Sequence, residues 1–194
     1  MTQAINPAIE STGASSESST GINCFIKKKE SWTKFLIKAA VVLTVMVLAG
    51  MAFASRYSIA GDPQEVRCIP GYTVYLVDKK DTELKRGQLY MFLSKDLSPI
   101  YEEGTEMLKY LRAVPGDEVE IRDNDQIFIN GEASEWGLGL AQDKLGQPSS
   151  NFHGKTKLGD DQYWFLGTSP KSFDSRYWGA VKRENIIGRA YPLF

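Results

Sequence analysis

Two side chains in this sequence have the chemistry of a catalytic pair. Cys68 begins an alternating run, "CIPGYTVYLV", and a cysteine thiolate is a strong nucleophile. Lys109 lies on a second alternating run, "MLKYLRAV". If that run is a strand, positions 107, 109, 111 and 113 share one face, and Lys109 is the polar member of an apolar set. Burial disfavours a charged ammonium and lowers the pKa of a lysine amine, so Lys109 is a candidate base. The alternative is that the Lys109 side chain extends to solvent and stays charged.

The rest of the composition limits the chemistry that is available. The 194 residues include two cysteines and one histidine, so a Cys/His pair has to use His153. The same counts do not predict a metal site of ordinary ligand spacing. No Gly-rich phosphate loop is visible, and a net charge of -1 does not indicate nucleic-acid binding. We therefore expect no metal, no cofactor and no nucleic-acid partner.

An apolar stretch near the N-terminus predicts one transmembrane helix over residues 34–55. Within it, "FLIKAAVVLTVMVLAGMAFA" is apolar apart from Lys38 and Thr44, and twenty residues span about 30 Å. Basic residues concentrate before the span, at Lys27, Lys28, Lys29 and Lys34, with little beyond Arg56 after it. This asymmetry predicts a cytosolic N-terminus and an external C-terminal part. A cleaved signal peptide is the alternative, because "AFAS" offers an A-x-A site, but the long leader favours a retained anchor.

The flanking segments predict a tail and one domain. Residues 1–33 form the predicted cytosolic tail, disordered over the part rich in Ser, Thr, Gly and Ala. Residues 56–194 are enough for a single domain with a real core. Short runs rich in Val, Ile, Leu, Tyr and Phe predict strands at 73–78, 88–94, 107–114, 118–123, 126–130 and 162–168. Residues 123–126 predict a hairpin in which Asn124 and Asp125 tolerate left-handed φ, and 132–160 predict a long loop or small inserted lobe.

The two cysteines fall on opposite sides of the predicted membrane. Cys24 is on the cytosolic side and Cys68 on the outer side, so they cannot form a disulfide within one chain. Cys68 as a small buried hydrophobe is the alternative to a nucleophile. Ser55 and Ser58 also follow the span and are competing nucleophiles, although neither is followed by x-Pro and a strand.

Several motifs together resemble the type I signal peptidases. "KYLRAVPGDEVEI" resembles their lysine box, with Lys109 six residues before Pro-Gly-Asp at 115–117. "LGTSPKSFDSRYWGAV" resembles their last box, in which a Gly-rich turn leads to Ser-x-Asp-Ser-Arg-x-Trp-Gly, here beginning at Ser172. "KRGQLYMF", "IFINGE" and "IIGRA" also fit the family, in the family's order. The resemblance covers residues 65–194 and the preceding anchor.

The nucleophile position is where this sequence departs from the family. The conjugative-transfer branch, of TraF type, has Ser-x-Pro leading into a strand, and here Cys68 stands in place of that serine, with Pro70 as the proline. The resemblance therefore implies a Cys68/Lys109 dyad, with Ser172 holding the lysine amine and the backbone N–H of Cys68 as an oxyanion donor. Asp174 and Arg176 are expected to brace the turn as an ion pair. Tyr110 replaces the arginine that commonly follows the lysine.

The resemblance implies a fold class and two competing functions. The fold is mainly β, an antiparallel β-sheet catalytic domain anchored by one N-terminal transmembrane helix in the bacterial inner membrane, with the domain in the periplasm. The first function is an endopeptidase that processes pilin or other exported precursors, with ring closure of pilin as a further outcome. The second is a catalytically inactive relative that acts as an assembly factor with conjugative secretion components.

Overall fold

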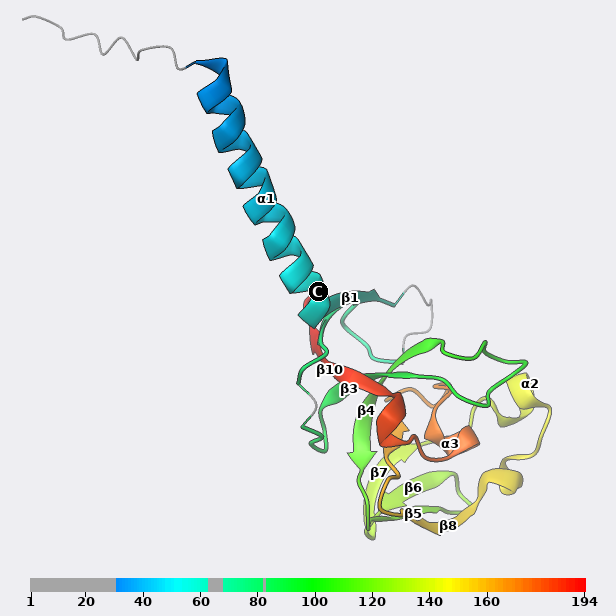
Figure 1. The fold of residues 1–194 in the computed structure, drawn as a ribbon. Coiled ribbons are helices and arrows are strands. Elements are labelled where there is room, and N and C mark those ends of the chain that lie inside the picture. Colours follow the sequence, from blue (N-terminus) through cyan, green and yellow to red (C-terminus); the bar gives the residue numbers. More distant parts are fainter. Residues whose placement is uncertain (1–30, 63–67, 82) are drawn as a thin grey trace, which may run out of the picture. The chain divides into compact units, whose positions relative to one another are not determined.

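The computed structural model describes residues 31–62, 68–81 and 83–194 (Figure 1). The chain divides into two compact units, residues 1–44 and 45–194, and the boundary falls inside helix α1 (Trp32–Arg56). Most of the expected tail, residues 1–33, lies outside the described residues, as does Cys24.

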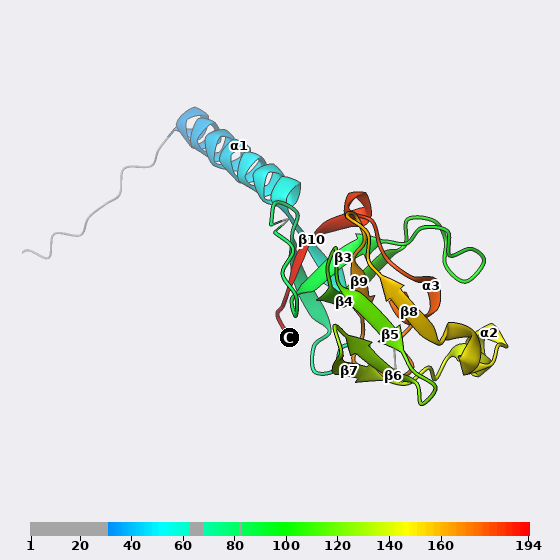
Figure 2. The ribbon, with the colours of Figure 1, turned by 90° about the horizontal axis from the view of Figure 1, so that it is seen from below.

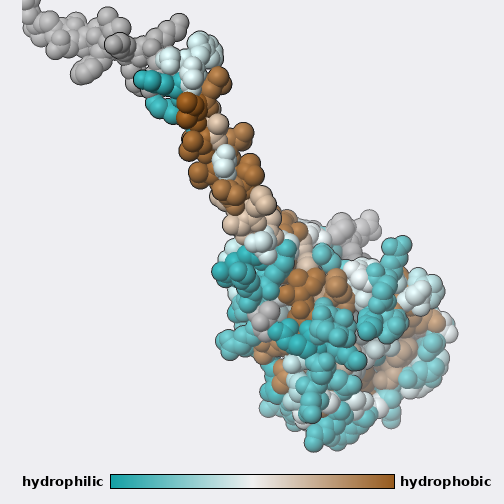
Figure 3. All heavy atoms as spheres, in the orientation of Figure 1, coloured by the Kyte–Doolittle hydropathy of each residue, from teal (hydrophilic) through white to brown (hydrophobic). Residues whose placement is uncertain are grey.

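Helix α1 is long and apolar enough to cross a membrane. Its 25 residues span about 37 Å, and it extends the predicted span by two residues at its N-terminal end and by one at its C-terminal end. In Figure 3 the surface of α1 is brown along most of its length, whereas the visible face of the domain is mostly teal. α1 is therefore a candidate membrane anchor, as the sequence predicts.

The first sheet has six antiparallel strands in the order β1-β2-β10-β3-β4-β9. They are β1 (Tyr57–Gly61), β2 (Val74–Asp78), β10 (Ile186–Pro192), β3 (Leu89–Leu93), β4 (Glu106–Ala113) and β9 (Trp164–Leu166). β3 is apolar on both faces: Tyr90 and Phe92 pack in one core cluster, and Leu89 and Met91 in another. These two clusters hold β4, the neighbour of β3, in the centre of the domain.

The second sheet has four antiparallel strands in the order β7-β6-β5-β8, and Figure 1 shows them gathered below the first sheet. They are β7 (Glu132–Trp136), β6 (Gln126–Ile129), β5 (Glu118–Ile121) and β8 (Gly154–Lys157). The hairpin between β5 and β6 confirms the prediction for 123–126, with Asp125 at a φ of 61°. The fold class is thus the predicted one, mainly antiparallel β.

The segment 132–160 differs from the predicted long loop or inserted lobe. It supplies the two outer strands of the second sheet, β7 and β8, and also α2 (Ala141–Leu145) and the 3₁₀ turn η1 (Ser149–Phe152). The physical reason is that β8, "GKTK", is exposed along its whole length and has no apolar residue to mark it as a strand. Backbone pairing with β5, and not an apolar pattern, makes it a strand.

Two further strands of the first sheet are absent from the predicted set, β1 and β10. β10 lies between β2 and β3, and Figure 2 shows it from a second direction. At Gly188 a Cβ would lie 2.9 Å from the carbonyl carbon of Asp78 and 2.9 Å from the Cα of Lys79, which no side chain tolerates. The glycine of "IIGRA" therefore lets β10 pass close to the end of β2. The helix α3 (Ser175–Trp178) and the turn η2 (Arg183–Asn185) precede β10.

Candidate active site

Lys109 is held on the inner face of β4. Met107, Lys109, Leu111 and Ala113 are all buried and alternate with more exposed residues, as the strand spacing predicts. Lys109 is 7% exposed, and its backbone is paired with that of Tyr90 on β3. Among the described residues its amine forms neither a hydrogen bond nor an ion pair. The amine therefore stands at the wall of a pocket with its bonding capacity still available to a substrate or a neighbouring group.

Cys68 is attached to the loop that follows β9. It is 7% exposed, and its carbonyl oxygen accepts hydrogen bonds from the backbone N–H of Thr168, at 3.0 Å, and from its hydroxyl, at 3.2 Å. Cys68 and Lys109 line the same pocket, which has a volume of about 500 Å³. The structure therefore brings the predicted thiol and amine to one cavity from positions 41 residues apart in the sequence.

Gly167 is the point around which the three predicted site residues gather. Tyr110 on β4 pairs with Leu166 on β9, so the next positions along these antiparallel strands place Lys109 beside Gly167. A Cβ at Gly167 would overlap the hydroxyl oxygen of Ser172 and would lie 3.1 Å from the carbonyl oxygen of Cys68. The missing side chain therefore makes the room that Ser172 occupies.

Ser172 is completely buried in this position. Its side-chain oxygen has no hydrogen-bond partner among the described residues. A buried hydroxyl without a partner costs stability, and a catalytic role or a bound water are among its ordinary explanations. Sequence reasoning identified Ser172, but the part played by Gly167 was visible only as the glycine of a Gly-rich turn.

Asp174 and Arg176 brace the turn that carries Ser172, and the predicted ion pair is confirmed. Both side chains are fully buried, and the guanidinium donates to the carboxylate at 2.7 Å and 2.6 Å. Burial alone would lower the pKa of Arg176, but the hydrogen bond and the charge of Asp174 raise it above its ordinary value. The guanidinium also donates to the carbonyls of Gly137, Gly167 and Ser169.

A second buried carboxylate, Asp117, joins three of the sequence motifs. It accepts hydrogen bonds from the Arg86 side chain, at 2.9 Å to the Nε, from the Asn130 amide, at 2.8 Å, and from the backbone of Val114, at 2.8 Å. Arg86 comes from "KRGQLYMF" and Asn130 from "IFINGE", so these motifs hold the turn after β4. No role for Arg86 or Asn130 was predicted; the position of each inside a matching motif was the available signal.

Tyr110, where the family commonly has arginine, takes part in a set of contacts between β4 and the second sheet. The guanidinium of Arg112 lies 4.8 Å from the centre of the Tyr110 ring and donates to Glu135 on β7 at 2.6 Å. This contact links β4 to the second sheet.

The competing candidates lie elsewhere. The Ser55 hydroxyl donates to the carbonyl of Ala52 within α1, and Ser58 is on β1, paired with Val77. His153 lies 2.7 Å from Asp125 at the hairpin between β5 and β6, and it lines other cavities. None of these three side chains lines the pocket of Cys68 as far as the described residues define it. Within those residues, no group of three His, Cys, Asp or Glu could hold a metal ion.

Part of the pocket wall is an edge of β4 that, within the described strands, has a neighbouring strand on one side only. β4 pairs with β9 only from Tyr110 to Ala113, so within the described strands the segment Glu106–Lys109 is paired on its β3 side alone. Residues 105–109 line the pocket. An extended peptide can add to an unpaired strand edge of this kind through main-chain hydrogen bonds. The arrangement therefore offers a thiol, an amine and a strand edge to a polypeptide in one cavity.

Comparison with known proteins identifies the family of this chain. Residues 31–194 match the family model described as "Signal peptidase, peptidase S26". The chain is 32% identical over 176 residues to the probable signal peptidase I-2 of Synechocystis sp., covering 87% of this chain and 78% of that protein. It is 28% identical over 179 residues to signal peptidase I P of Bacillus subtilis subsp. natto, covering 87% of this chain and 91% of that protein.

A solved structure is also similar, that of a signal peptidase I from Enterococcus faecalis. It has 27% sequence identity and a TM-score of 0.37, and the match covers 57% of this chain and 98% of that one. The match of the family model to most of the chain, together with the identity to the Synechocystis protein, shows that this chain belongs to the signal peptidase family, peptidase S26, and is a signal peptidase-like endopeptidase.

Proposed function

We propose that Cys68 is the nucleophile of this endopeptidase, Lys109 its general base and Ser172 the group that positions the lysine amine. The observation that carries the proposal is that Cys68 and Lys109, both almost fully buried, line one pocket, while the buried hydroxyl of Ser172 lies against Gly167 beside them. Cys68 occupies the place that serine has in the resembling TraF-type branch. A thiol ionises far more readily than a serine hydroxyl, so the exchange keeps the reaction feasible.

The reaction follows from these positions. The Sγ atom of Cys68 attacks the carbonyl carbon of the scissile peptide bond, and the thiol proton passes to the Nζ of Lys109, which acts as the general base. The backbone N–H of Cys68 donates to the developing oxyanion. The carbon–nitrogen bond then breaks, Lys109 returns the proton to the leaving amine, and a thioester remains on Cys68. Water, deprotonated by Lys109, attacks the thioester and releases the acid and the thiol.

The substrate is a precursor polypeptide at a membrane, in keeping with the family. By resemblance to the TraF-type branch, on the strength of the "CIP" sequence, we propose a pilin or another exported precursor and a role in conjugative pilus assembly. If the pilin's own amine attacks the thioester in place of water, the product is a ring. The basic residues before α1 support a cytosolic N-terminus, with the domain on the periplasmic face of the inner membrane.

Substitution of the three site residues in the full-length, membrane-bound chain tests the proposal. Cys68→Ala should abolish precursor processing, and Cys68→Ser should retain part of it, because the resembling dyads use serine. Lys109→Arg should abolish processing, because a guanidinium keeps its proton. Ser172→Ala should lower the rate without loss of stability, because it removes a buried hydroxyl that has no partner in the described structure. Ser58→Ala and Cys24→Ala serve as matched controls and should process normally.

Two readouts distinguish the competing functions. A thiol alkylator should inactivate the wild type but not the Cys68→Ser variant. Mass spectrometry of the mature product should show a free carboxylate for hydrolysis, or the loss of one water for ring closure. Normal maturation by Cys68→Ala, or by wild type fully alkylated at Cys68, would contradict the proposal and favour the inactive assembly factor.

A further inference from the structure

Lys144 places an ammonium group in the pocket of Cys68 and Lys109. It lies in α2, and its ammonium is 4.7 Å from the centre of the Tyr101 ring and 4.9 Å from that of Phe173. It also donates to the Tyr101 hydroxyl at 3.5 Å. An ammonium over two aromatic rings is attracted to their faces and held in place. All three residues line the pocket.

A chain of aromatic contacts ties Lys144 to the turn that carries Ser172. The Tyr101 and Phe173 rings are 5.5 Å apart, and the Phe173 and Tyr177 rings are stacked at 5.6 Å. The Tyr177 hydroxyl accepts a hydrogen bond from the backbone of Leu140, the residue before α2, at 3.0 Å. Because Phe173 directly follows Ser172, the position of Lys144 is linked to that of the proposed catalytic group.

Within the part of the chain that the structure describes, no carboxylate neutralises Lys144 in the pocket. Lys171, the other exposed lysine of the pocket, lies 3.9 Å from Asp143. No carboxylate among the described residues forms an ion pair with Lys144. The pocket's own acids, Asp62 and Glu106, are at the ends of β1 and β4, on the strand side. The pocket is therefore lined by Lys144 and Lys171, from α2 and the turn that carries Ser172, and by Asp62 and Glu106, next to β1 and on β4.

We propose that Lys144 is a specificity-determining residue that selects a precursor with an aspartate or glutamate side chain near the scissile bond. This inference rests on the proposed function of the Cys68 pocket. A substrate carboxylate would form the ion pair that no described residue forms with Lys144, and the rings that already hold the ammonium reduce the conformational entropy lost on binding. Glu106, on β4, also lines the pocket and repels the same carboxylate, so the charges also favour one placement of the peptide.

A peptide series tests this selection with the full-length chain in detergent. Peptides that carry Glu, Gln or Lys at each position flanking the cleavage site are compared by kcat/KM. At one position the kcat/KM of the wild type should be about two- to fivefold higher for the Glu peptide than for the Gln peptide, mostly because KM is lower. Added salt should weaken this preference, because it screens the charges. Lys144→Gln should remove the preference, Lys144→Arg should retain it, and Lys144→Glu should transfer it to the lysine peptide.

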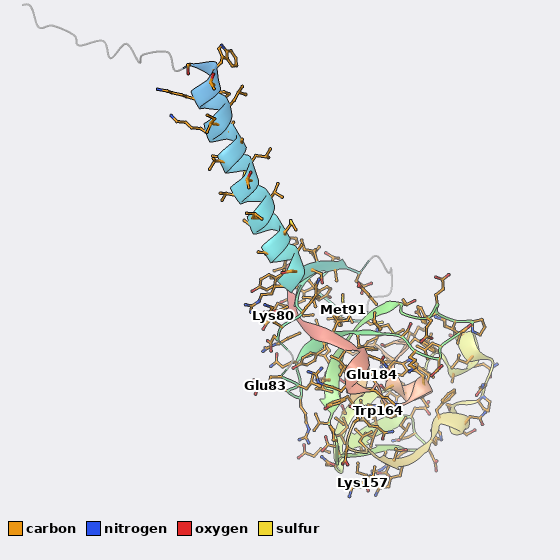
Figure 4. The ribbon with its side chains drawn as sticks, in the orientation of Figure 1. Lys80, Glu83, Met91, Lys157, Trp164 and Glu184 are labelled. Carbon is orange, nitrogen blue, oxygen red and sulfur yellow. The ribbon has the colours of Figure 1, made fainter. Side chains whose placement is uncertain are left out.

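Lys157 is the matched control for these variants. It is an exposed lysine on β8, at the edge of the domain in Figure 4, and Lys157→Gln should leave every ratio unchanged. Equal cleavage of the Glu, Gln and Lys peptides by wild type, or a preference that persists in Lys144→Gln, would overturn this inference and leave the proposed function standing. If the wild type cleaves no peptide and no natural precursor, the proposed function fails, and the inference fails with it.

Discussion

At the scale of single residues, the site depends on a side chain that is missing. Gly167 faces Ser172 so closely that a Cβ would lie 2.8 Å from the serine Cβ, and it also faces the carbonyl oxygen of Cys68. Neither neighbour has much freedom to move, because Ser172 is fully buried and the Cys68 carbonyl is bonded to Thr168. Any larger residue at this position must therefore displace one of the proposed catalytic groups.

Gly167→Ala should lower processing by about a hundredfold, because displacements of about 1 Å are enough to misalign reacting groups. Overpacking should also cost about 1–3 kcal/mol of unfolding free energy. Processing assays and thermal unfolding of the solubilised chain measure the two effects. Adding Ser172→Gly makes room for the new Cβ, so the double variant should regain stability but not activity. Wild-type activity in Gly167→Ala would show that processing does not depend on the close approach of Ser172 and the Cys68 carbonyl to Gly167.

At the scale of elements, β4 carries Lys109, and the loop between β9 and α3 carries Ser172 and holds Cys68 by hydrogen bonds from Thr168. The Arg176 guanidinium holds this loop, because it pairs with Asp174 and donates to the carbonyls of Gly137, Gly167 and Ser169. Gly137 follows β7, so the same side chain connects the loop to the second sheet. The ion pair therefore acts as a structural clamp on the loop that carries Ser172.

Arg176→Lys should destabilise the chain, because an ammonium cannot reproduce the planar fork and leaves the Asp174 carboxylate and several carbonyls poorly paired. Complete removal of one side of a buried pair costs about 3–5 kcal/mol, so this charge-conserving change should cost less than that, and the melting temperature should fall by less than about 20 °C. Circular dichroism of the solubilised chain measures this change. Arg122→Lys is the matched control, because its pair with Glu120 is partly exposed, and its effect should be small. Equal shifts for the two variants would contradict the clamp.

At the scale of the whole molecule, the chain combines one apolar helix, the candidate membrane anchor, with one β domain. β1 begins at Tyr57, directly after α1 ends at Arg56, so no linker separates them. The Arg56 guanidinium donates to Asp78 at the end of β2, at 2.7 Å, and thereby ties the end of the helix to the sheet. The domain is thus joined directly to the end of the candidate anchor.

The proposed orientation predicts that alkaline phosphatase, which is active only outside the cytosol, will be active when fused to the C-terminus. The same enzyme fused to the N-terminus should be inactive, because Lys27, Lys28 and Lys29 favour a cytosolic start. A cytosolic reporter should show the opposite pattern. An active N-terminal fusion together with an inactive C-terminal one would put the pocket in the wrong compartment and contradict the proposed function.

The sequence by itself determined what depends on local pattern. The apolar run was enough for α1, because length and composition decide whether a helix can span a membrane. Alternation was enough to place Lys109 on the same face as Met107 and Leu111, because side chains of a strand have a period of two, but its burial came from the structure. The ordered motifs were enough for the family, and the ion pair between Asp174 and Arg176 was predicted from the same motifs.

Only the tertiary structure decided what depends on long-range pairing. β8 has no apolar pattern, so its place beside β5 could not be inferred from "GKTK". Ser172 lies against a glycine five residues away because the loop folds back, and Cys68 joins them through a hydrogen bond to Thr168, a hundred residues further along the chain. Spacing in sequence does not record such contacts, because side-chain packing and backbone hydrogen bonds between distant segments form only when both sheets are assembled.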